Sequence, residues 1–125
     1  MGNLLLVMLG GAVGAGLRHL FGRAATTLLG SGWPWGTLGV NLIGGFAMGL
    51  LVAFLAREAM GGEPARLLLG VGVLGGFTTF SAFSLDAALM IERGELASAL
   101  AYVAASVAGA ILALFAGLSI GRIAA

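Results

Sequence analysis

The sequence contains no cysteine, no lysine and very little charge. Of its 125 residues 9% are charged, and all six basic residues are arginines. The absence of cysteine excludes disulfides, thiolate metal sites and cysteine nucleophiles. The formal net charge of +1 argues against nucleic acid as a partner, because such binding depends on many basic contacts with phosphates.

The side-chain groupings that most enzymes use are missing as well. The sequence offers no serine–histidine pair, no paired carboxylates and no set of metal ligands, and its single histidine, His19, has no second histidine to complete a metal site. The first acidic residue is Glu58, so the apolar segments before it hold no carboxylate to relay protons or bind a cationic drug. We predict that the protein is not an enzyme.

Apolar residues dominate what is present. They make up 60% of the chain, and the mean hydropathy is +1.11, far above the balance of a soluble domain. No charge occurs in residues 2–17, 24–56, 67–85 and 96–121. A bilayer core of about 30 Å needs about 20 apolar residues in helical form. The sequence therefore predicts an all-α membrane protein with four transmembrane helices in a single domain, residues 1–125.

We expect these helices over about residues 3–29, 35–56, 66–91 and 95–121. The first is expected to be a retained span and not a signal peptide, because no basic residue precedes its apolar run. The chain has 23 glycines, many of them four residues apart within the expected helices. Small residues at that spacing let helices approach closely. Some of these glycine faces are expected to pack against a second chain.

The arginines divide evenly between the two ends of such a bundle. One end would hold Arg57, Arg66 and Arg122, and the other would hold Arg18, Arg23 and Arg93. Membrane proteins orient by an excess of basic residues on the cytoplasmic side, and here there is no excess. The balance predicts insertion in both orientations, with two opposite copies forming an antiparallel homodimer. Alternatively, some of these arginines lie inside helices and do not contribute to the orientation. Arg18 is the first candidate for such a position.

The string "GGFTTFSAF", residues 75–83, is poor material for the middle of an apolar helix. Glycines weaken a helix, and threonine hydroxyls compete for its backbone hydrogen bonds. We expect the third helix to be broken in mid-membrane near residues 75–79. Free backbone groups cannot face lipid, so a break would line a cavity or an ion site. The alternative is a packing notch with back-bonded threonines in an intact helix.

Several side chains around this string are candidates for a pathway. Phe80 and Phe83 lie on one helix face, with Ser81 beside them, and the positive edges of phenylalanine rings can face an anion. Asn41, deep in the second helix, can donate two hydrogen bonds from its amide. Both features have structural alternatives, namely ordinary packing for the rings and helix association for the amide. Arg18 near membrane depth is either functional, snorkelling to the interface, or bonded to backbone carbonyls at another helix end.

These residues carry a resemblance to a known family. "GGFTTFSAFSLD" is similar to the signature of the Fluc (CrcB) family of fluoride channels. "GVNLIGGFAMG" and "GAVGAGLRHLFGR" resemble that family's second-helix and first-helix motifs. The resemblance extends over nearly the whole chain in length, helix number and motif order. It implies a dual-topology antiparallel dimer with two fluoride pathways and a structural sodium ion at its centre.

The resemblance also implies roles for single residues. The carbonyls of Gly75 and Thr78 would bind the sodium ion, and Phe80 and Phe83 would line the pore. The Asn41 amide and Ser106 would contact fluoride. From the residues alone, Ser81 is a further candidate for the fluoride pathway, and Arg18 is a candidate for the vestibule whose role stays open. In many relatives a hydroxyl follows one turn after the residue at 106, but here that position is Ala110. The polar track along the fourth helix is therefore in doubt at that point.

The function implied is passive export of fluoride through the plasma (inner) membrane of a bacterium, which protects the cytoplasm. Two other functions stay open from the residues alone. A small multidrug transporter is also a four-helix, dual-topology dimer, although it needs a glutamate in its first helix. A structural membrane subunit would use the glycines and Asn41 for helix association alone.

Overall fold

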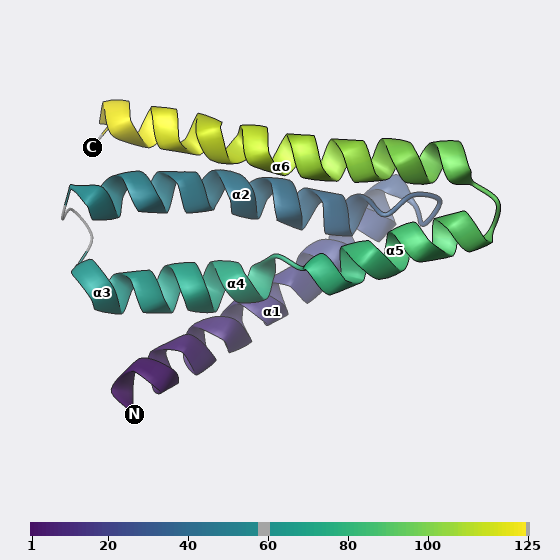
Figure 1. Ribbon diagram of the computed structural model, residues 1–125. Helices are drawn as coiled ribbons and strands as arrows, with labels where there is room; N and C mark the ends of the chain where they lie inside the picture. The colour runs from purple at the N-terminus through teal and green to yellow at the C-terminus, as the bar shows by residue number, and fades with distance from the viewer. Residues whose placement is uncertain (58–60, 125) are drawn as a thin grey trace.

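The computed structural model describes residues 1–57 and 61–124, and every regular element within them is helical. The elements, shown in Figure 1, are α1 (Gly2–Leu29), α2 (Trp35–Ala56), α3 (Gly62–Ala65), the π-helix η1 (Arg66–Leu74), α4 (Gly75–Phe77), α5 (Phe80–Glu92) and α6 (Leu96–Ala124). Four stretches are long and apolar enough to cross a membrane: α1, α2, the run from α3 to α5, and α6. The prediction of an all-α protein with four membrane-spanning helices is confirmed.

The expected helix bounds agree closely with the observed ones. The first helix begins one residue earlier than expected, the second matches, and the fourth runs to Ala124. The third begins at Gly62, four residues early, because Glu63 and Pro64 occupy a first helical turn in which proline loses no hydrogen bond. The expected loop at 57–66 includes residues 58–60, which lie outside the described residues.

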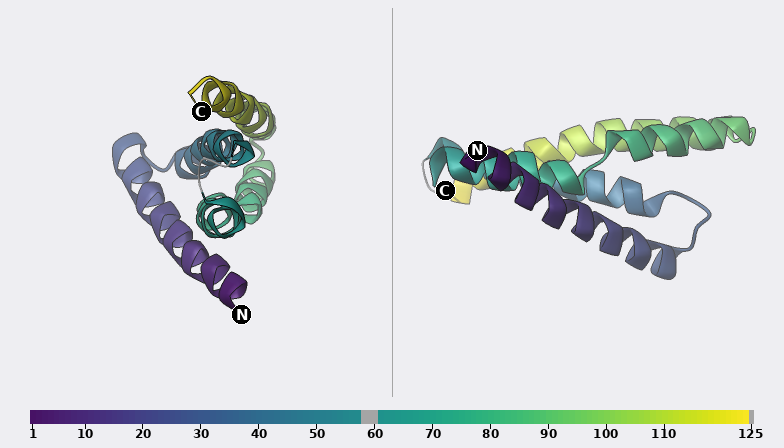
Figure 2. Two further views of the ribbon diagram at one scale, coloured as in Figure 1. Left: turned by 90° about the vertical axis from the view of Figure 1, so that its left-hand side faces the viewer. Right: turned by 90° about the horizontal axis from the view of Figure 1, so that it is seen from below.

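Both termini and α3 lie at one end of the bundle, and the α1–α2 and α5–α6 turns lie at the other (Figure 1). Helix α2 runs beside α6, whereas α1 crosses η1 and α4 at a marked angle (Figure 2). At the end that holds the termini, the Arg57 guanidinium donates to the carbonyl of Arg122 at 2.6 Å. The helices therefore assemble as two packed pairs, α2 with α6 and α1 with the third span.

Glycines make both pairs possible by removing the side chain where backbones meet. Between α1 and η1, a Cβ on Gly10 would lie 2.9 Å from the Cα of Gly72. Between α2 and α6, a Cβ on Gly117 would lie against the Phe46 carbonyl and 3.0 Å from the amide of Leu50. Lipid supplies no hydrophobic drive for helix association, so close backbone contact is the main source of attraction.

The third span changes its helical form twice along its length. Residues 66–74 form a π-helix, which the sequence did not predict, and Thr78 and Thr79 leave the helix altogether. Thr78 has φ −83° and ψ 159°, and Thr79 has φ −153° and ψ 121°, so both are extended. Gly75 and Gly76, which were expected within the interruption, are helical instead.

For Gly76 the physical reason is packing against α1. A Cβ on Gly76 would lie 2.6 Å from the carbonyl oxygen of Gly11 on α1. The glycine therefore allows α1 to touch the backbone of α4. The departure from helix occurs two residues later, at the β-branched threonines.

Gly117→Ala is expected to lower stability by about 1–3 kcal/mol, because the new methyl group has no space against α2. Gly16→Ala is the matched control, since a Cβ at that helical position meets nothing within 4 Å in the chain. Thermal unfolding in detergent, followed by circular dichroism, measures both. Equal melting temperatures for the two variants would contradict the close α2–α6 contact.

Candidate functional site

The interruption at Thr78 and Thr79 is held by side chains from within its own span. The Thr78 amide and hydroxyl both donate to the Leu74 carbonyl, each at 3.0 Å, which closes the end of α4. The Thr79 hydroxyl accepts from the amide of Ala82 at 3.2 Å and so caps the start of α5. The back-bonding considered for an intact helix is thus present at Thr78, together with extended backbone.

Asn41 on α2 forms hydrogen bonds with the backbone of the interruption from a neighbouring helix. Its Oδ1 accepts from the Thr79 amide at 2.8 Å, and its Nδ2 donates to the Thr79 carbonyl at 3.0 Å. Both polar atoms of the side chain therefore bind one residue's backbone. The sequence predicted two hydrogen bonds from this amide to an anion. With one amide hydrogen used on Thr79, one is left for that purpose.

These bonds change which backbone carbonyls are satisfied. In a continuous helix, the Thr79 amide would donate to Gly75 and the Ala82 amide to Thr78. Here the Thr79 amide donates to Asn41 and the Ala82 amide donates to the Thr79 hydroxyl. The carbonyls of Gly75 and Thr78 thereby lose their usual helical donors. Gly75 as a residue is exposed on the chain surface.

An open pocket of about 420 Å³ lies against the interruption. It brings together most of the side chains that the sequence singled out, namely Asn41, Thr78, Phe80, Phe83 and Ser106. Apart from Thr79, the remaining lining is apolar and comes from α2 and α6, including Ala110. The pocket therefore offers a few polar groups inside an apolar wall, as small-ligand sites commonly do.

The two phenylalanines lie side by side but differ in exposure. Their ring centroids are 5.4 Å apart with an interplanar angle of 50°. Phe83 is 8% exposed and packs on Tyr102 at 5.3 Å, whereas Phe80 is 76% exposed. Phe83 therefore has a packing role in this chain as well as a place in the pocket. Phe80 has no such role, because most of its ring is uncovered.

The serines are placed differently from one another. The hydroxyl of Ser106 is buried and has no hydrogen-bond partner within the part of the chain that the structure describes. A buried polar group without a partner is costly, so one that faces a pocket is available to a ligand. Ser81 is exposed, lies 3.4 Å from the Thr79 hydroxyl, and is not part of the pocket lining.

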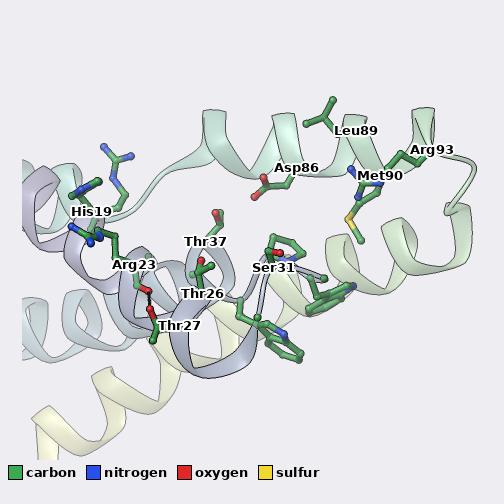
Figure 3. A pocket seen from close by; sticks show the side chains of 18 residues that line it. His19, Arg23, Thr26, Thr27, Ser31, Thr37, Asp86, Leu89, Met90 and Arg93 are labelled. Atoms are coloured by element: carbon green, nitrogen blue, oxygen red, sulfur yellow. Dashed lines mark hydrogen bonds between the residues drawn. The ribbon is translucent and has the colours of Figure 1, made fainter.

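A second pocket, of about 690 Å³, lies at the end that holds the α1–α2 turn (Figure 3). Its lining holds more polar side chains than that of the first pocket, beside the tryptophans and other apolar residues. The polar residues include Arg18, His19, Arg23, Thr26, Thr37, Asp86 and Arg93. Figure 3 shows Asp86 on α5 pointing toward Thr37 on α2. Of the three arginines in this lining, Arg93 is paired with Glu95 at 3.3 Å.

Tyr102 contacts residues of both pockets and has no exposed surface. Its ring packs on Phe83, and its hydroxyl donates to the Asp86 carboxylate at 3.0 Å. Its ring also lies 5.4 Å from that of Trp33, whose indole donates to Ser98 at 2.8 Å. No role was predicted for Tyr102 or Asp86 from the sequence. A carboxylate within an apolar span was the signal that could have found them.

Arg18 is half-buried on α1, and its Nε donates to the Gly76 carbonyl at 3.0 Å. Of the three roles considered from the sequence, bonding to the carbonyls of another helix end is therefore realised. The same side chain also lines the polar pocket. Arg18 is not part of the pocket that holds Asn41 and the phenylalanines.

Comparison with known proteins places the chain in a well-defined group. The family described as CrcB-like protein, Camphor Resistance (CrcB), matches residues 5–118. A protein from Chelativorans sp. (strain BNC1), named fluoride-specific ion channel FluC, is 62% identical over 122 residues, 98% of each chain. Proteins of the same name from Sphingopyxis alaskensis and Caulobacter vibrioides are 56% and 55% identical, over 98% of this chain and 97% of theirs.

Thr79→Ala is expected to destabilise the start of α5 by about 1 kcal/mol, because the Ala82 amide loses its acceptor. Thr79→Ser keeps the hydroxyl and is the matched control. Hydrogen exchange at the Ala82 amide measures the local effect, with thermal unfolding for the whole chain. Exchange that is as slow in the alanine variant as in the serine variant would show that the hydroxyl does not cap this helix.

Proposed function

The chain belongs to the CrcB family, and we propose that it is a fluoride-selective ion channel that lets fluoride leave the bacterial cytoplasm passively through the plasma membrane. The observation that carries this proposal is identity of more than half over almost the full chain to proteins named fluoride-specific ion channels. A channel of this kind makes and breaks no covalent bonds, so the protein is not an enzyme. Such a channel must provide groups that replace the hydration water that fluoride loses on entering the pathway.

The pocket beside the interruption holds groups suited to that work. The free amide hydrogen of Asn41 and the unpartnered hydroxyl of Ser106 are donors that fluoride accepts well. The edges of Phe80 and Phe83 carry partial positive charge without a formal cation that would trap the ion. Ser81, whose hydroxyl lies 3.4 Å from that of Thr79 in the pocket lining, would serve at the entrance. Narrow pores lined by such donors favour small anions.

The carbonyls of Gly75 and Thr78 are suited to a sodium ion. Their usual helical donors, the amides of Thr79 and Ala82, are engaged elsewhere, and this supports the assignment. Unwound backbone in broken membrane helices supplies carbonyls for sodium in this way. When bound, the ion would provide a fixed positive charge that lowers the cost of an anion nearby. It would be structural and not transported.

We propose that two copies pair in antiparallel orientation around the interruptions, at mid-membrane. Phe80 is 76% exposed beside an open pocket, although a pore-lining ring needs a wall on both sides. A second copy in contact with this face would close the pocket and bring two further carbonyls to the sodium ion. The even division of arginines between the two ends of the bundle supports insertion in both orientations. Lipid would cover the remaining apolar surface.

The other two functions receive less support. A small multidrug transporter would need a carboxylate in α1, which has none, and the family match points elsewhere. A purely structural subunit would explain the glycine contacts. It would not explain a buried serine hydroxyl without a partner in a pocket.

Liposomes that contain the purified protein are expected to release fluoride rapidly and chloride far more slowly, as measured with ion-selective electrodes. Phe80→Ile should lower fluoride release by at least about tenfold, since an aliphatic side chain has no positive edge to offer. The dimer should persist, because the substitution leaves an apolar side chain on the face that meets the second copy. Ile111→Val, on the α6 wall of the same pocket, is the control for lost bulk. Normal release from the Phe80 variant would remove that ring from the pathway.

Removal of sodium by exhaustive dialysis into potassium buffer of equal ionic strength is expected to lower the melting temperature of the dimer. Ligand at about 100 times its dissociation constant stabilises the folded state by about 2.7 kcal/mol. Return of sodium should restore the melting temperature, whereas further addition of potassium should not. A melting temperature independent of sodium would rule out a structural sodium site at these carbonyls.

A further inference from the structure

Arg18 is a cation placed inside an apolar span, and its position needs an explanation. It is half-buried in α1, which otherwise carries only His19 and Arg23 as basic side chains. A charged group at such depth is expensive unless it binds a partner. Its Nε donates to the Gly76 carbonyl, 58 residues away in the sequence, at 3.0 Å. The arginine therefore acts on the third span and not on its own helix.

The carbonyl that Arg18 binds is one that the interruption leaves open. In a continuous helix the amide of Phe80 would donate to Gly76. Phe80 is instead the first residue of α5, beyond two extended threonines. The last carbonyls of a helix carry its negative partial charge, and a cationic side chain there offsets that charge. Arg18 therefore caps the carbonyl end of the helical run from Gly62 to Phe77.

The geometry of α1 holds this contact in place. Gly10, Gly14 and Arg18 are four residues apart, so they share one face of the helix. A Cβ on Gly14 would lie 2.8 Å from the amide of Phe77, and Gly76 is equally close to Gly11. The backbones of α1 and α4 thus touch one turn before the arginine. Because they touch, the guanidinium reaches Gly76 from a fixed position.

The other side of the interruption is fastened separately. Asn41 binds both backbone groups of Thr79 from α2, as described above. Arg18 and Asn41 therefore hold the two sides of the extended segment from two different helices. Only the arginine brings charge.

We propose that Arg18 is a positioning residue for the fluoride pathway, which binds the Gly76 carbonyl to keep the interruption open and to offset the negative helix end that an anion would otherwise meet. The proposal rests on the proposed channel function. The arginine would act through the backbone, without contact with the ion in the phenylalanine pocket, whose lining does not include it. The carbonyl of Gly76 is turned toward α1 by this bond. The neighbouring carbonyls of Gly75 and Thr78 stay available.

The test compares Arg18→Gln with Arg23→Gln in liposomes and in detergent. Arg23 lines the same polar pocket from the same helix, so its variant removes the same charge without touching Gly76. Arg18→Gln is expected to lower fluoride release about tenfold or more, because the carbonyl loses a charged donor. It should also speed hydrogen exchange at the amides of residues 79–82. Arg23→Gln should change release by less than about twofold, since it alters only a screened charge near water.

Several outcomes would overturn the proposal. Equal loss of release in the two variants would show a general charge effect of the pocket. Reduced release from Arg18→Gln with unchanged exchange at residues 79–82 would show that the arginine acts on the ion and not on the backbone. Normal release and exchange would show no role at all. Dimer content, measured alongside, should match between the two variants, because a role in assembly alone would lower it for Arg18→Gln.

Two further arrangements keep the result interpretable. If Arg18→Gln does not fold, Arg18→Lys and Arg23→Lys replace the pair. Arg18→Lys is then expected to lower release several-fold and speed exchange, because a flexible point charge replaces a rigid planar donor. Equal behaviour of the two lysine variants would overturn the proposal. If the unaltered protein moves no fluoride, the channel function fails, and the exchange measurement still decides whether Arg18 holds the interruption.

Discussion

A peptide group inside a bilayer has no water to bind, so any departure from helix within a span must be satisfied by the protein. That constraint governs the third span of this chain. Two extended threonines free a set of backbone amides and carbonyls between α4 and α5. Their partners come from three helices: Arg18 from α1, Asn41 from α2 and the Thr79 hydroxyl at the start of α5. The carbonyls of Gly75 and Thr78 lose their usual helical donors, and the ion chemistry proposed for the protein depends on them.

The glycine contacts follow from the same constraint. Arg18 and Asn41 reach the interruption only because their helices lie against the third span and against one another. Gly76 meets Gly11 across the α1–α4 contact, and Gly117 meets α2 across the α2–α6 contact. Side chains at these positions would move the helices apart and carry the two polar groups out of reach. The polar capping of the interruption therefore depends on the close packing of the helices.

The sequence predicted the spans well, because a bilayer imposes a length and excludes charge over that length. It also drew attention to the right residues, since polar and glycine-rich strings are conspicuous in an apolar chain. The sequence could not show which residues these side chains and glycines would contact. Gly75 and Gly76 were expected to break the helix, but the contact with α1 uses Gly76 for packing, and no local pattern reveals which backbone will approach a glycine. The pairing of Arg18 with Gly76, and of Tyr102 with Asp86, likewise joins positions far apart in the chain.

The aromatic rings described above have an optical consequence. Trp33 and Trp35 are the only tryptophans in the sequence, and their rings lie 4.8 Å apart at one end of the bundle. From Trp33 a series of neighbouring rings runs through Tyr102 and Phe83 to Phe80 beside the interruption, with centroid separations of 5.4, 5.3 and 5.4 Å. Tryptophan fluorescence from the chain therefore comes from one place in the bundle. The series of packed rings connects that place to the phenylalanine pocket. The protein contains its own unlabelled fluorophore for following changes in that pocket.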